Sequence, residues 1–472
     1  MGRKKKKEIF VDLNIESIGF EGVAIGRDDD IVHFVKYAVP GDKLKAQVFK
    51  KKKSFRHCRI VEMYEESEHR ETPVCKYFGQ CGGCSWQNIK YDEQLKWKKQ
   101  HVKDALERIG KIEYGELADT LPAKQIFNYR NKMDFSFGAS RWLTAEEVKD
   151  DGDIEQKDFA LGLHVPGRFD KVIDIDVCHI QSEFGNEILD SLRKKALEFG
   201  VKAYNLRSHE GFLRELIIRR GIKYNQFMII LVTNNPNGKK ETDFLKWYET
   251  EFLANEKINS GYHSINSTKS PVNIDKLNHL KGNEYITEAI LDIDYKISPY
   301  SFFQTNPFQL DEFISNILDY ADIKSDEIIW DLYCGTGSIT LPASKKAKKV
   351  IGIELVESSI KDAKENARIN DIENVEFHCS DLHEKGIPDL LEKLETPDTV
   401  ILDPPRAGIH KNLLNHILEL APKKVVYVSC NPSTQARDCQ ILDEKYKLVK
   451  IMPVDMFPQT YHIESIALLE LK

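Results

Sequence analysis

The chain has 472 residues, of which 41% are hydrophobic and 30% are charged. This is enough apolar material for a large core, and the length suggests about three domains. The longest uncharged apolar runs, such as residues 227–232, are far too short to span a membrane, and no apolar signal-peptide core follows the basic start. We therefore expect a cytoplasmic protein without membrane contact, whose nine cysteines are free thiols, metal ligands or a nucleophile rather than disulfides.

The net charge of −7 does not suggest a nucleic-acid partner, but the distribution of charge does. Residues 1–62 contain 15 Lys or Arg against 9 Asp or Glu, with lysine runs at 4–7 and 50–53. A single lysine run is usually a solvated face or a mobile tail. Two runs that bracket a strand-rich segment favour contact with phosphates.

Residues 9–63 show five short alternating runs, separated by glycine, aspartate and proline turns. This pattern predicts a small closed barrel of the OB type. Such barrels commonly bind single strands through basic and aromatic side chains. A barrel that serves only as a protein contact is the alternative.

Three cysteines, Cys75, Cys81 and Cys84, lie within ten residues and have glycines between them. Their spacing lies outside the usual zinc pattern of two CxxC pairs. An all-thiolate iron–sulfur cluster needs a fourth cysteine, which can come from far along the chain, and Cys178 is the best candidate. A zinc site that uses Cys178 or His179 is the alternative, and spacing alone leaves it open.

The segment between this loop and residue 300 predicts one helix and then many strands. Residues 90–111 have apolar side chains at helical spacing and stop at Gly110, and residues 125–300 predict mainly short strands with one acidic insertion at 144–157. Cationic side chains interleaved with rings suit RNA, although they also suit the surface strands of a structural domain. The cationic residues are Arg130, Lys132, Arg207, Arg214, Arg219, Arg220 and Lys223.

From residue 325 strand and helix patterns alternate, which predicts a parallel α/β sheet with right-handed crossovers. After the first strand, Gly335 and Gly337 allow a ligand to approach the backbone, and the second strand ends at Glu354, which can accept hydrogen bonds from both ribose hydroxyls. Thr340 stands where the third glycine of a dinucleotide fingerprint would be. This disfavours NAD and leaves room for S-adenosylmethionine.

Later strands of this region also end at acidic residues. One ends at Asp381, a plausible adenine contact, and another ends at Asp403, directly before Pro404 and Pro405. A lone acid at a strand end is often only a helix cap, which is the alternative for Asp381. The two prolines lock an extended turn at the edge where ligands gather in such sheets.

A strand-like run at 425–429 delivers Cys430 to the same edge, because Asn431 and Pro432 turn the chain there. After a second strand-like run, Glu464 begins another apolar strand. A thiol and a carboxylate are thus brought near one another late in the fold. A buried free cysteine is most often only a small apolar residue, which is the alternative for Cys430 taken alone.

Several stretches together resemble the bacterial RNA uracil-C5 methyltransferases nearly end to end, and residues 19–27 resemble part of a TRAM domain, an RNA-binding module. The stretches are CKYFGQCGGC (75–84), SFFQTNPFQ (301–309), DLYCGTGSIT (331–340), ILDPPRAGIH (401–410), VSCNPST (428–434) and FPQTYHIES (457–465).

The resemblance implies a role for each matching residue. Cys430 would be the nucleophile and Glu464 the base. The implied contacts of S-adenosylmethionine are Gln304, Tyr333, Glu354 and Asp403, and the implied ligands of a [4Fe–4S] cluster are Cys75, Cys81, Cys84 and Cys178. The TRAM-like barrel together with the cluster cysteines resembles the branch that acts on 23S rRNA, since the bacterial tRNA branch typically lacks both.

On this basis we expect a class I SAM-dependent methyltransferase of the α/β class with a Rossmann-like sheet. Its domains would be a TRAM-like OB barrel at 1–66, a mainly β central RNA-binding domain with the iron–sulfur loop at 67–89 and 125–300, and the catalytic domain at 90–124 and 301–472. We expect a monomer that binds RNA, with 23S rRNA as the expected substrate. A tRNA enzyme, or an RNA-binding assembly factor with a relict methyltransferase fold, is the alternative.

The expected chemistry explains why a thiol and a carboxylate are needed. Carbon 5 of uracil is a weak nucleophile, and addition of a thiolate at carbon 6 converts the ring to a reactive enolate. Cys430 then requires a lowered pKa or a nearby base, and Glu464 requires desolvation that makes it basic enough to remove the hydrogen from carbon 5. The uridine must be flipped out of any stack to meet the thiol.

Overall fold

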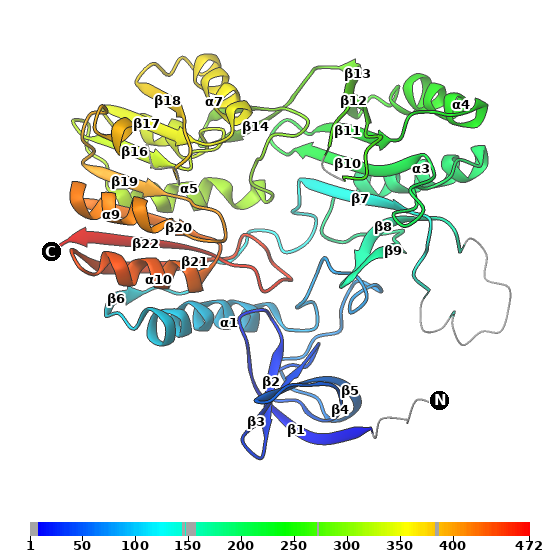
Figure 1. Ribbon diagram of the computed structural model, residues 1–472, viewed down its shortest axis with the longest axis horizontal. Helices are drawn as coiled ribbons and strands as arrows, with labels where there is room; N and C mark the ends of the chain where they lie inside the picture. The colour runs from blue at the N-terminus through cyan, green and yellow to red at the C-terminus, as the bar shows by residue number, and fades with distance from the viewer. Residues whose placement is uncertain (1–7, 144–146, 148–156, 271–272, 383–386) are drawn as a thin grey trace.

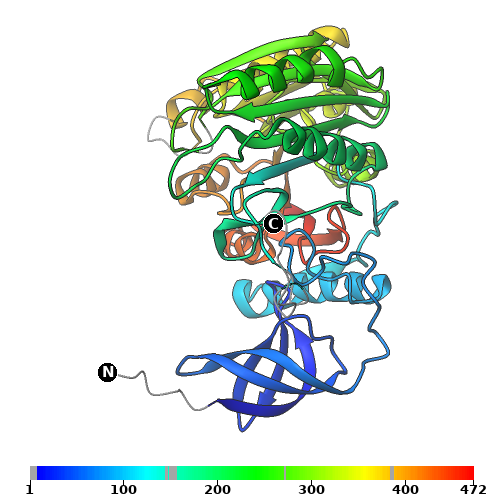
Figure 2. The same ribbon diagram turned by 90° about the vertical axis from the view of Figure 1, so that its right-hand side faces the viewer.

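A computed structural model describes residues 8–143, 147, 157–270, 273–382 and 387–472. The chain forms a closed barrel, a seven-stranded sheet, an eight-stranded sheet and a separate two-stranded hairpin. The two large sheets lie side by side and the barrel lies at one end of the molecule, below both (Figures 1 and 2). Of the acidic insertion expected at 144–157, residues 144–146 and 148–156 lie outside the described residues.

The predicted five-stranded barrel is confirmed. Its strands follow the order β1-β2-β3-β5-β4, and alternate side chains such as Leu13, Ile15 and Leu44 form a small core of their own. The strands are β1 (Ile9–Ile18), β2 (Ala24–Asp28), β3 (Ile31–Val35), β4 (Lys43–Lys51) and β5 (Phe55–Glu65).

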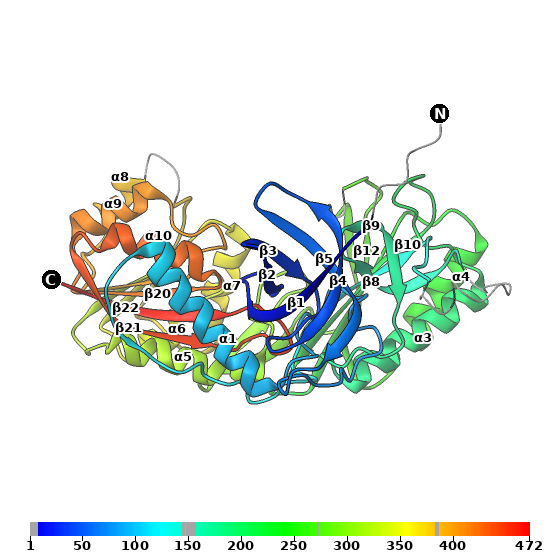
Figure 3. The ribbon, with the colours of Figure 1, turned by 90° about the horizontal axis from the view of Figure 1, so that it is seen from below.

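The helix predicted at 90–111 is also confirmed. Helix α1 (Tyr91–Asp104) continues as the π-helix η1 (Ala105–Gly110), and strand β6 (Tyr114–Leu117) then joins the edge of the eight-stranded sheet. Gly110 permits close packing on α10 (Pro432–Leu442), since a Cβ at this position would lie 2.9 Å from the carbonyl oxygen of Ala436. Helix α1 therefore lies across the eight-stranded sheet, next to the barrel (Figure 3).

The central sheet has the order β13-β12-β11-β10-β7-β8-β9. Its strands are β7 (Lys132–Gly138), β8 (Ala160–Val165), β9 (Arg168–Asp174), β10 (Leu213–Gly221), β11 (Gln226–Thr233), β12 (Ile258–Ile265) and β13 (Lys276–Gly282). Two helices that the strand pattern did not indicate, α3 (Glu183–Phe199) and α4 (Lys239–Trp247), bury Leu192 and Phe244 in the core of this region. Helix α4 continues as the π-helix η2 (Tyr248–Phe252).

Two of the arginines expected to face RNA are structural instead. Arg214 and Arg219 are 6% and 3% exposed. Arg214 donates to the carbonyl oxygens of Asn266 and Thr268, both at 2.7 Å. Arg219 donates to the carbonyl oxygens of Ser298 and Pro299, at 2.7 and 3.0 Å. The structural alternative therefore applies to these two side chains, which hold loops to the sheet.

The eight-stranded sheet confirms the predicted α/β class. Its order is β18-β17-β16-β19-β20-β22-β21-β6, and β22 pairs antiparallel with both β20 and β21. Because β22 runs against β20, the start of β22 lies at the edge where β20 ends. The strands are β16 (Ile328–Leu332), β17 (Lys349–Glu354), β18 (Val375–Cys379), β19 (Thr399–Leu402), β20 (Lys424–Ser429), β21 (Tyr446–Val454) and β22 (Glu464–Leu471).

The remaining helices accompany this sheet. They are α5 (Pro307–Ala321), α6 (Thr340–Ser344), α7 (Glu357–Ile369), α8 (Ile387–Leu391) and α9 (Lys411–Leu420). A hairpin of β14 (Ile286–Ile290) and β15 (Ile293–Ile297) packs into the same core cluster as α5. No helix in the described part of the chain combines the length and the apolar character that a bilayer crossing requires.

Candidate active site

A cavity of about 580 Å³ opens at the carboxyl edge of the eight-stranded sheet. It brings together nearly every residue that the sequence singled out for catalysis or cofactor binding. Those that line it are Gln304, Tyr333, Gly335, Glu354, Asp381, Asp403, Cys430 and Glu464. Gly337 is not among the lining residues. It has a φ of 87°, and a Cβ at this position would lie 3.3 Å from Leu341 Cγ, so the glycine is required by the conformation of the turn.

Glu354 is held in place by backbone amides at the end of β17. Its Oε2 accepts a hydrogen bond from the Gly335 N–H at 3.1 Å, and its Oε1 accepts one from the Val356 N–H at 2.9 Å. Gly335 has a φ of 54°, and a Cβ at this position would meet no atom within 4 Å. The positive φ, not crowding, therefore accounts for the glycine, and the backbone beside Glu354 is open to a ligand.

The neighbouring Tyr333 has a φ of 70°, a left-handed conformation that bulky side chains adopt rarely. Such conformations cluster at ligand sites, where the surrounding structure holds them. Here the N–H of Tyr333 donates to the carbonyl oxygen of Ile353 at 2.9 Å, which ties the loop after β16 to β17. The loop that carries the predicted cofactor glycines is thus fixed to the strand that carries Glu354.

Exposed apolar side chains of the cavity were missed by the sequence reasoning. Phe302, Leu355 and Val356 are 65%, 58% and 48% exposed and line the cavity. The sequence signal that could have indicated them is the apolar pair Leu355 and Val356, directly after Glu354 at the end of its strand. The carboxylate of Glu354, which two backbone amides hold in place, lies beside these exposed apolar side chains. This combination suits a nucleoside without phosphates, so the cavity fits S-adenosylmethionine.

Cys430 and Glu464 are brought together by strand register. Ser429, the last residue of β20, pairs with Ser465, the second residue of β22. Cys430 follows the first and Glu464 precedes the second, so the thiol and the carboxylate lie at the same end of two hydrogen-bonded strands. Both line the cavity that also contains Glu354.

Burial changes the acid–base properties of this pair. It raises the pKa of Cys430 to about 11, with further raising by Glu464 and Asp403, while Arg406 lowers it. Burial, and to a lesser extent Asp403, raises the pKa of Glu464 well above its usual value. Of the two alternatives expected for Cys430, a lowered pKa or a nearby base, the first is therefore not met. The other condition, a nearby base, is present, and Glu464 is desolvated as expected.

Arg406 and His462 form a second polar pair in the cavity. Arg406 Nη2 lies 3.3 Å from His462 Nδ1. Burial, and then Arg406, lowers the pKa of His462 to about 4, so its ring is neutral at pH 7 and Nδ1 can accept from the guanidinium. The hydrogen bond to His462 thus orients the guanidinium of Arg406, whose positive charge acts on Cys430. The sequence placed His462 in the motif but assigned it no role.

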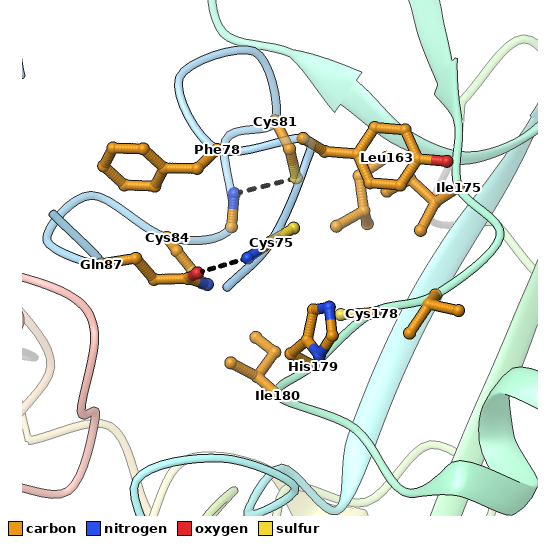
Figure 4. A pocket seen from close by; sticks show the side chains of 13 residues that line it. Cys75, Phe78, Cys81, Cys84, Gln87, Leu163, Ile175, Cys178, His179 and Ile180 are labelled. Carbon is orange, nitrogen blue, oxygen red and sulfur yellow. Dashed lines mark hydrogen bonds between the residues drawn. The ribbon is translucent and has the colours of Figure 1, made fainter. Parts of the chain in front are cut away.

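The four cysteines expected to bind a cluster line one pocket (Figure 4). Cys178 follows β9 of the central sheet, and Cys75, Cys81 and Cys84 lie in the loop between β5 and α1. Hydrogen bonds order this loop: the Cys75 N–H donates to Gln87 Oε1 at 3.1 Å. The other lining side chains are mostly apolar and include Phe78, Leu163, Ile175 and Ile180.

The chemistry of this pocket suits the binding of a cationic centre. Burial, and the neighbouring thiols, raise the pKa of Cys81 and of Cys84 to about 12, which a bound cationic centre would reverse. Among the described residues, no three His, Cys, Asp or Glu side chains are gathered tightly enough to hold a single metal ion. Four thiols around one mostly apolar pocket fit the all-thiolate ligand set of an iron–sulfur cluster.

Comparison with known proteins places the chain in a family. The pattern of the family described as tRNA (Uracil-5-)-methyltransferase matches residues 276–472. A protein of Bacteroides thetaiotaomicron, described as an uncharacterized RNA methyltransferase, is 40% identical over 455 residues, which cover 96% of this chain and 99% of that protein. A Porphyromonas gingivalis protein of the same description is 39% identical over 464 residues, which cover 97% and 99%.

A solved structure is similar over nearly the whole chain. The Pyrococcus abyssi tRNA (uracil-54, C5)-methyltransferase, in complex with S-adenosyl-L-homocysteine, matches with a TM-score of 0.75 and 28% identity, over 97% of this chain and 100% of that one. The cavity, its thiol–carboxylate pair and these relatives agree. This chain therefore belongs to the RNA uracil-C5 methyltransferase family, enzymes that use S-adenosylmethionine to methylate carbon 5 of uridine in RNA.

Proposed function

We propose that this protein methylates a uridine of 23S rRNA through a covalent adduct between Cys430 and carbon 6 of the base. The observation that carries the proposal is the register of β20 and β22, which places Cys430 and Glu464 side by side in one cavity with the predicted cofactor residues. A thiol with a carboxylate next to it is the pair that addition followed by proton removal requires.

Each step assigns one bond change to a side chain. Bound S-adenosylmethionine supplies the methyl group. The thiolate of Cys430 forms a bond to carbon 6, and the electron pair of the C5–C6 double bond moves toward the carbonyl oxygen at carbon 4. Carbon 5 of this enolate then forms a bond to the methyl carbon while the sulfur–methyl bond of the donor breaks, which leaves S-adenosylhomocysteine. Glu464 removes the hydrogen left on carbon 5, the double bond re-forms, and the sulfur–carbon bond breaks to release Cys430.

The charges around the cavity suit these steps. Arg406 favours the thiolate form of Cys430, since its guanidinium lowers the thiol pKa. The same positive charge can stabilise the enolate that forms on addition. A carboxylate in water is a weak base, and the burial of Glu464 makes it a stronger one.

Aromatic and basic side chains on the barrel support a contact with unpaired RNA. Rings of β3, β4 and β5 form what we call the barrel patch: Phe34, Phe49, Phe55 and His57. The His57 centroid lies 5.4–6.1 Å from those of the other three rings. Lysines 36, 50 and 52 are close enough to lower the pKa of His57, after the larger effect of burial.

Phe49 is the most accessible ring of the barrel patch, with 57% of it exposed. The pairing of β4 with β5 is irregular between Val48 and Lys50, so Phe49 lies where the regular pairing of the two strands is interrupted. Exposed rings beside lysines are the features with which proteins stack unpaired bases and neutralise phosphates.

Two further features support 23S rRNA as the substrate and a [4Fe–4S] cluster as the second prosthetic group. The barrel is present, and Cys75, Cys81, Cys84 and Cys178 share one apolar pocket. The barrel and the two large sheets also support the domain division proposed from the sequence, with α1 and β6 in the catalytic domain. An rRNA substrate would place the enzyme in the cytoplasm.

A tRNA substrate is the second candidate, because the solved relative acts on tRNA and the matching family is described by tRNA. Mapping 5-methyluridine in 23S rRNA and in tRNA, from cells with and without the gene, decides between the two. Loss of the modification from rRNA alone supports the proposal, and loss from tRNA alone contradicts it.

The covalent route is tested with 5-fluorouridine in the substrate RNA. Fluorine on carbon 5 cannot be removed as a proton, so the methylated adduct should remain bound to the enzyme in a denaturing gel. Wild-type protein with S-adenosylmethionine should be trapped, and Cys430→Ala should not. A wild-type enzyme that methylates normal RNA yet is never trapped would rule out the adduct.

A further inference from the structure

The segment of residues 455–463 connects β21 to β22 and leads directly into Glu464. Phe457 and His462 of this segment line the cavity. Gln459 has a φ of 68°, although it is not a glycine. A conformation of this kind persists where the surrounding contacts hold it. The contacts of segment 455–463 therefore bear on where Glu464 lies.

A buried ion pair fixes the start of the segment to α1. Lys98 and Asp455 have no solvent exposure, and Lys98 Nζ lies 2.5 Å from Asp455 Oδ1. Lys98 also donates to the carbonyl oxygen of Phe457 at 3.1 Å. The hydroxyl of Tyr91 donates to Asp455 Oδ2 at 2.9 Å. A charge this deeply buried needs its partner, so the pair ties the segment to one position on the helix.

A second contact fixes the middle of the segment. Gln94 Nε2 donates to Gln459 Oε1 at 3.1 Å, and the Gln459 N–H donates to Gln94 Oε1 at 3.0 Å. The N–H groups of Ser85 and Trp86 both donate to the carbonyl oxygen of Gln459 at 3.0 Å. Residues before and within α1 thus bind both backbone polar groups of Gln459, the residue of this segment with the left-handed conformation.

The end of the segment is held by the same part of the chain. The Tyr461 N–H donates to Ser85 Oγ at 3.1 Å. Gly22 of the barrel packs so closely that a Cβ there would lie 2.8 Å from the Cβ of Tyr461. The barrel, the loop after Cys84 and α1 therefore meet on the segment that precedes Glu464.

We propose that α1, through Lys98 and Gln94, positions Glu464 for proton removal. The inference rests on the proposed role of Glu464 as the base. Adduct formation depends on Cys430, which β20 delivers independently of this segment, whereas release of the methylated product depends on Glu464. A loosened segment should therefore slow proton removal and product release more than adduct formation and methyl transfer.

The test compares variants of the anchor with a matched variant of the same helix. Lys98→Met combined with Asp455→Asn removes both buried charges together, and Gln94→Ala leaves the ion pair in place. Lys99→Met is the control, because Lys99 is the next residue of α1 and pairs with Asp119, which is 96% exposed. Methylated adduct and free product are measured in single-turnover reactions, with Glu464→Gln as the reference.

Both anchor variants should raise the ratio of methylated adduct to product about ten-fold, as expected for a misplaced catalytic group. Lys99→Met should match the wild type. A merely structural role predicts that adduct and product fall together, and that result would overturn the inference.

Amide hydrogen exchange of segment 455–463 provides a readout that does not depend on the base assignment. Exchange should be faster in both anchor variants and unchanged in Lys99→Met. Unchanged exchange in the anchor variants overturns the inference. If Glu464→Gln fails to accumulate adduct, the base assignment is what fails, and hydrogen exchange still decides whether α1 holds the segment.

Discussion

The guanidinium of Arg406 lies 3.3 Å from Nδ1 of His462, and both side chains line the cavity that contains Cys430. His462 is neutral because burial lowers its pKa to about 4, so this contact is a hydrogen bond to a neutral acceptor rather than an ion pair. The positive charge of Arg406 therefore stays available to the thiol. It favours the thiolate of Cys430, against burial and two carboxyls.

Alkylation of Cys430 should accordingly depend on pH over an unusual range. With a thiol pKa of about 11, the rate should still rise about ten-fold per pH unit between pH 8 and pH 10, whereas the rate of an ordinary thiol with a pKa of about 8.5 rises only about four-fold over this whole range. Arg406→Gln removes a lowering influence, raises the pKa further and should slow alkylation at each pH. Iodoacetamide labelling followed by mass spectrometry measures this, with the exposed Cys379 as the internal control. A rate that is half-maximal near pH 8.5 would contradict the raised pKa.

Glu464→Gln should separate methyl transfer from product release. The amide cannot take the proton from carbon 5, so methylated RNA should remain attached to Cys430, while Cys430→Ala should form no adduct. The expected loss of turnover is about 100-fold or more for a missing general base. Denaturing gels with labelled methyl donor measure both species. Normal turnover by Glu464→Gln would remove the base assignment.

Strand ends, and the nearness of Cys430 to Glu464, were predictable from the sequence, whereas the strand order that makes them neighbours and the buried contacts of α1 were not. Cys430 and Glu464 could be placed at strand ends because apolar runs stop beside them. That they are neighbours depends on β22 inserting antiparallel between β20 and β21, an arrangement of the whole sheet. Lys98 lies in a helical pattern where lysine usually faces water, yet its partner Asp455 is 357 residues away. Local patterns contain no signal for such a pair.

Phe49→Ala should weaken RNA binding without changing the chemistry. Stacking of one base on a ring contributes about 1–3 kcal/mol, so KM for RNA should rise about ten-fold while kcat stays the same. Phe10→Ala is a matched control, since Phe10 is also an exposed phenylalanine of the barrel, at 43%. Steady-state kinetics with saturating methyl donor measure the two constants. Equal KM values for both variants would exclude the barrel patch from RNA contact.

Glu354→Gln should weaken the binding of S-adenosylmethionine. The carboxylate accepts two backbone hydrogen bonds and is expected to accept those of the ribose, and the loss of one charge-assisted bond costs about 2 kcal/mol. This corresponds to a roughly thirty-fold higher Kd. Calorimetric titration measures it, with Glu357→Gln as the control, because Glu357 is an exposed glutamate three residues on. Equal affinity in both variants would exclude Glu354 as a cofactor contact.

Cys178→Ser should remove the metal centre that we propose for the thiol pocket. Anaerobically purified wild-type protein should contain iron and sulfide and absorb broadly in visible light, and the variant should lose both. Cys379→Ser is the control, because Cys379 is exposed and does not line the pocket. Zinc in place of iron would support the alternative metal.

The variant should also unfold at a lower temperature than Cys379→Ser. Cys178 lies on the side of the central sheet, whereas Cys75, Cys81 and Cys84 lie in the loop before α1, so a bound cluster would cross-link the two. Binding to the folded state alone stabilises it.

Because Ser85 and Trp86 directly follow Cys84 and hold Gln459, loss of the centre should also loosen segment 455–463. Faster hydrogen exchange in that segment in Cys178→Ser, but not in Cys379→Ser, is the expected result, and equal exchange would show that the loop holds the segment without the centre.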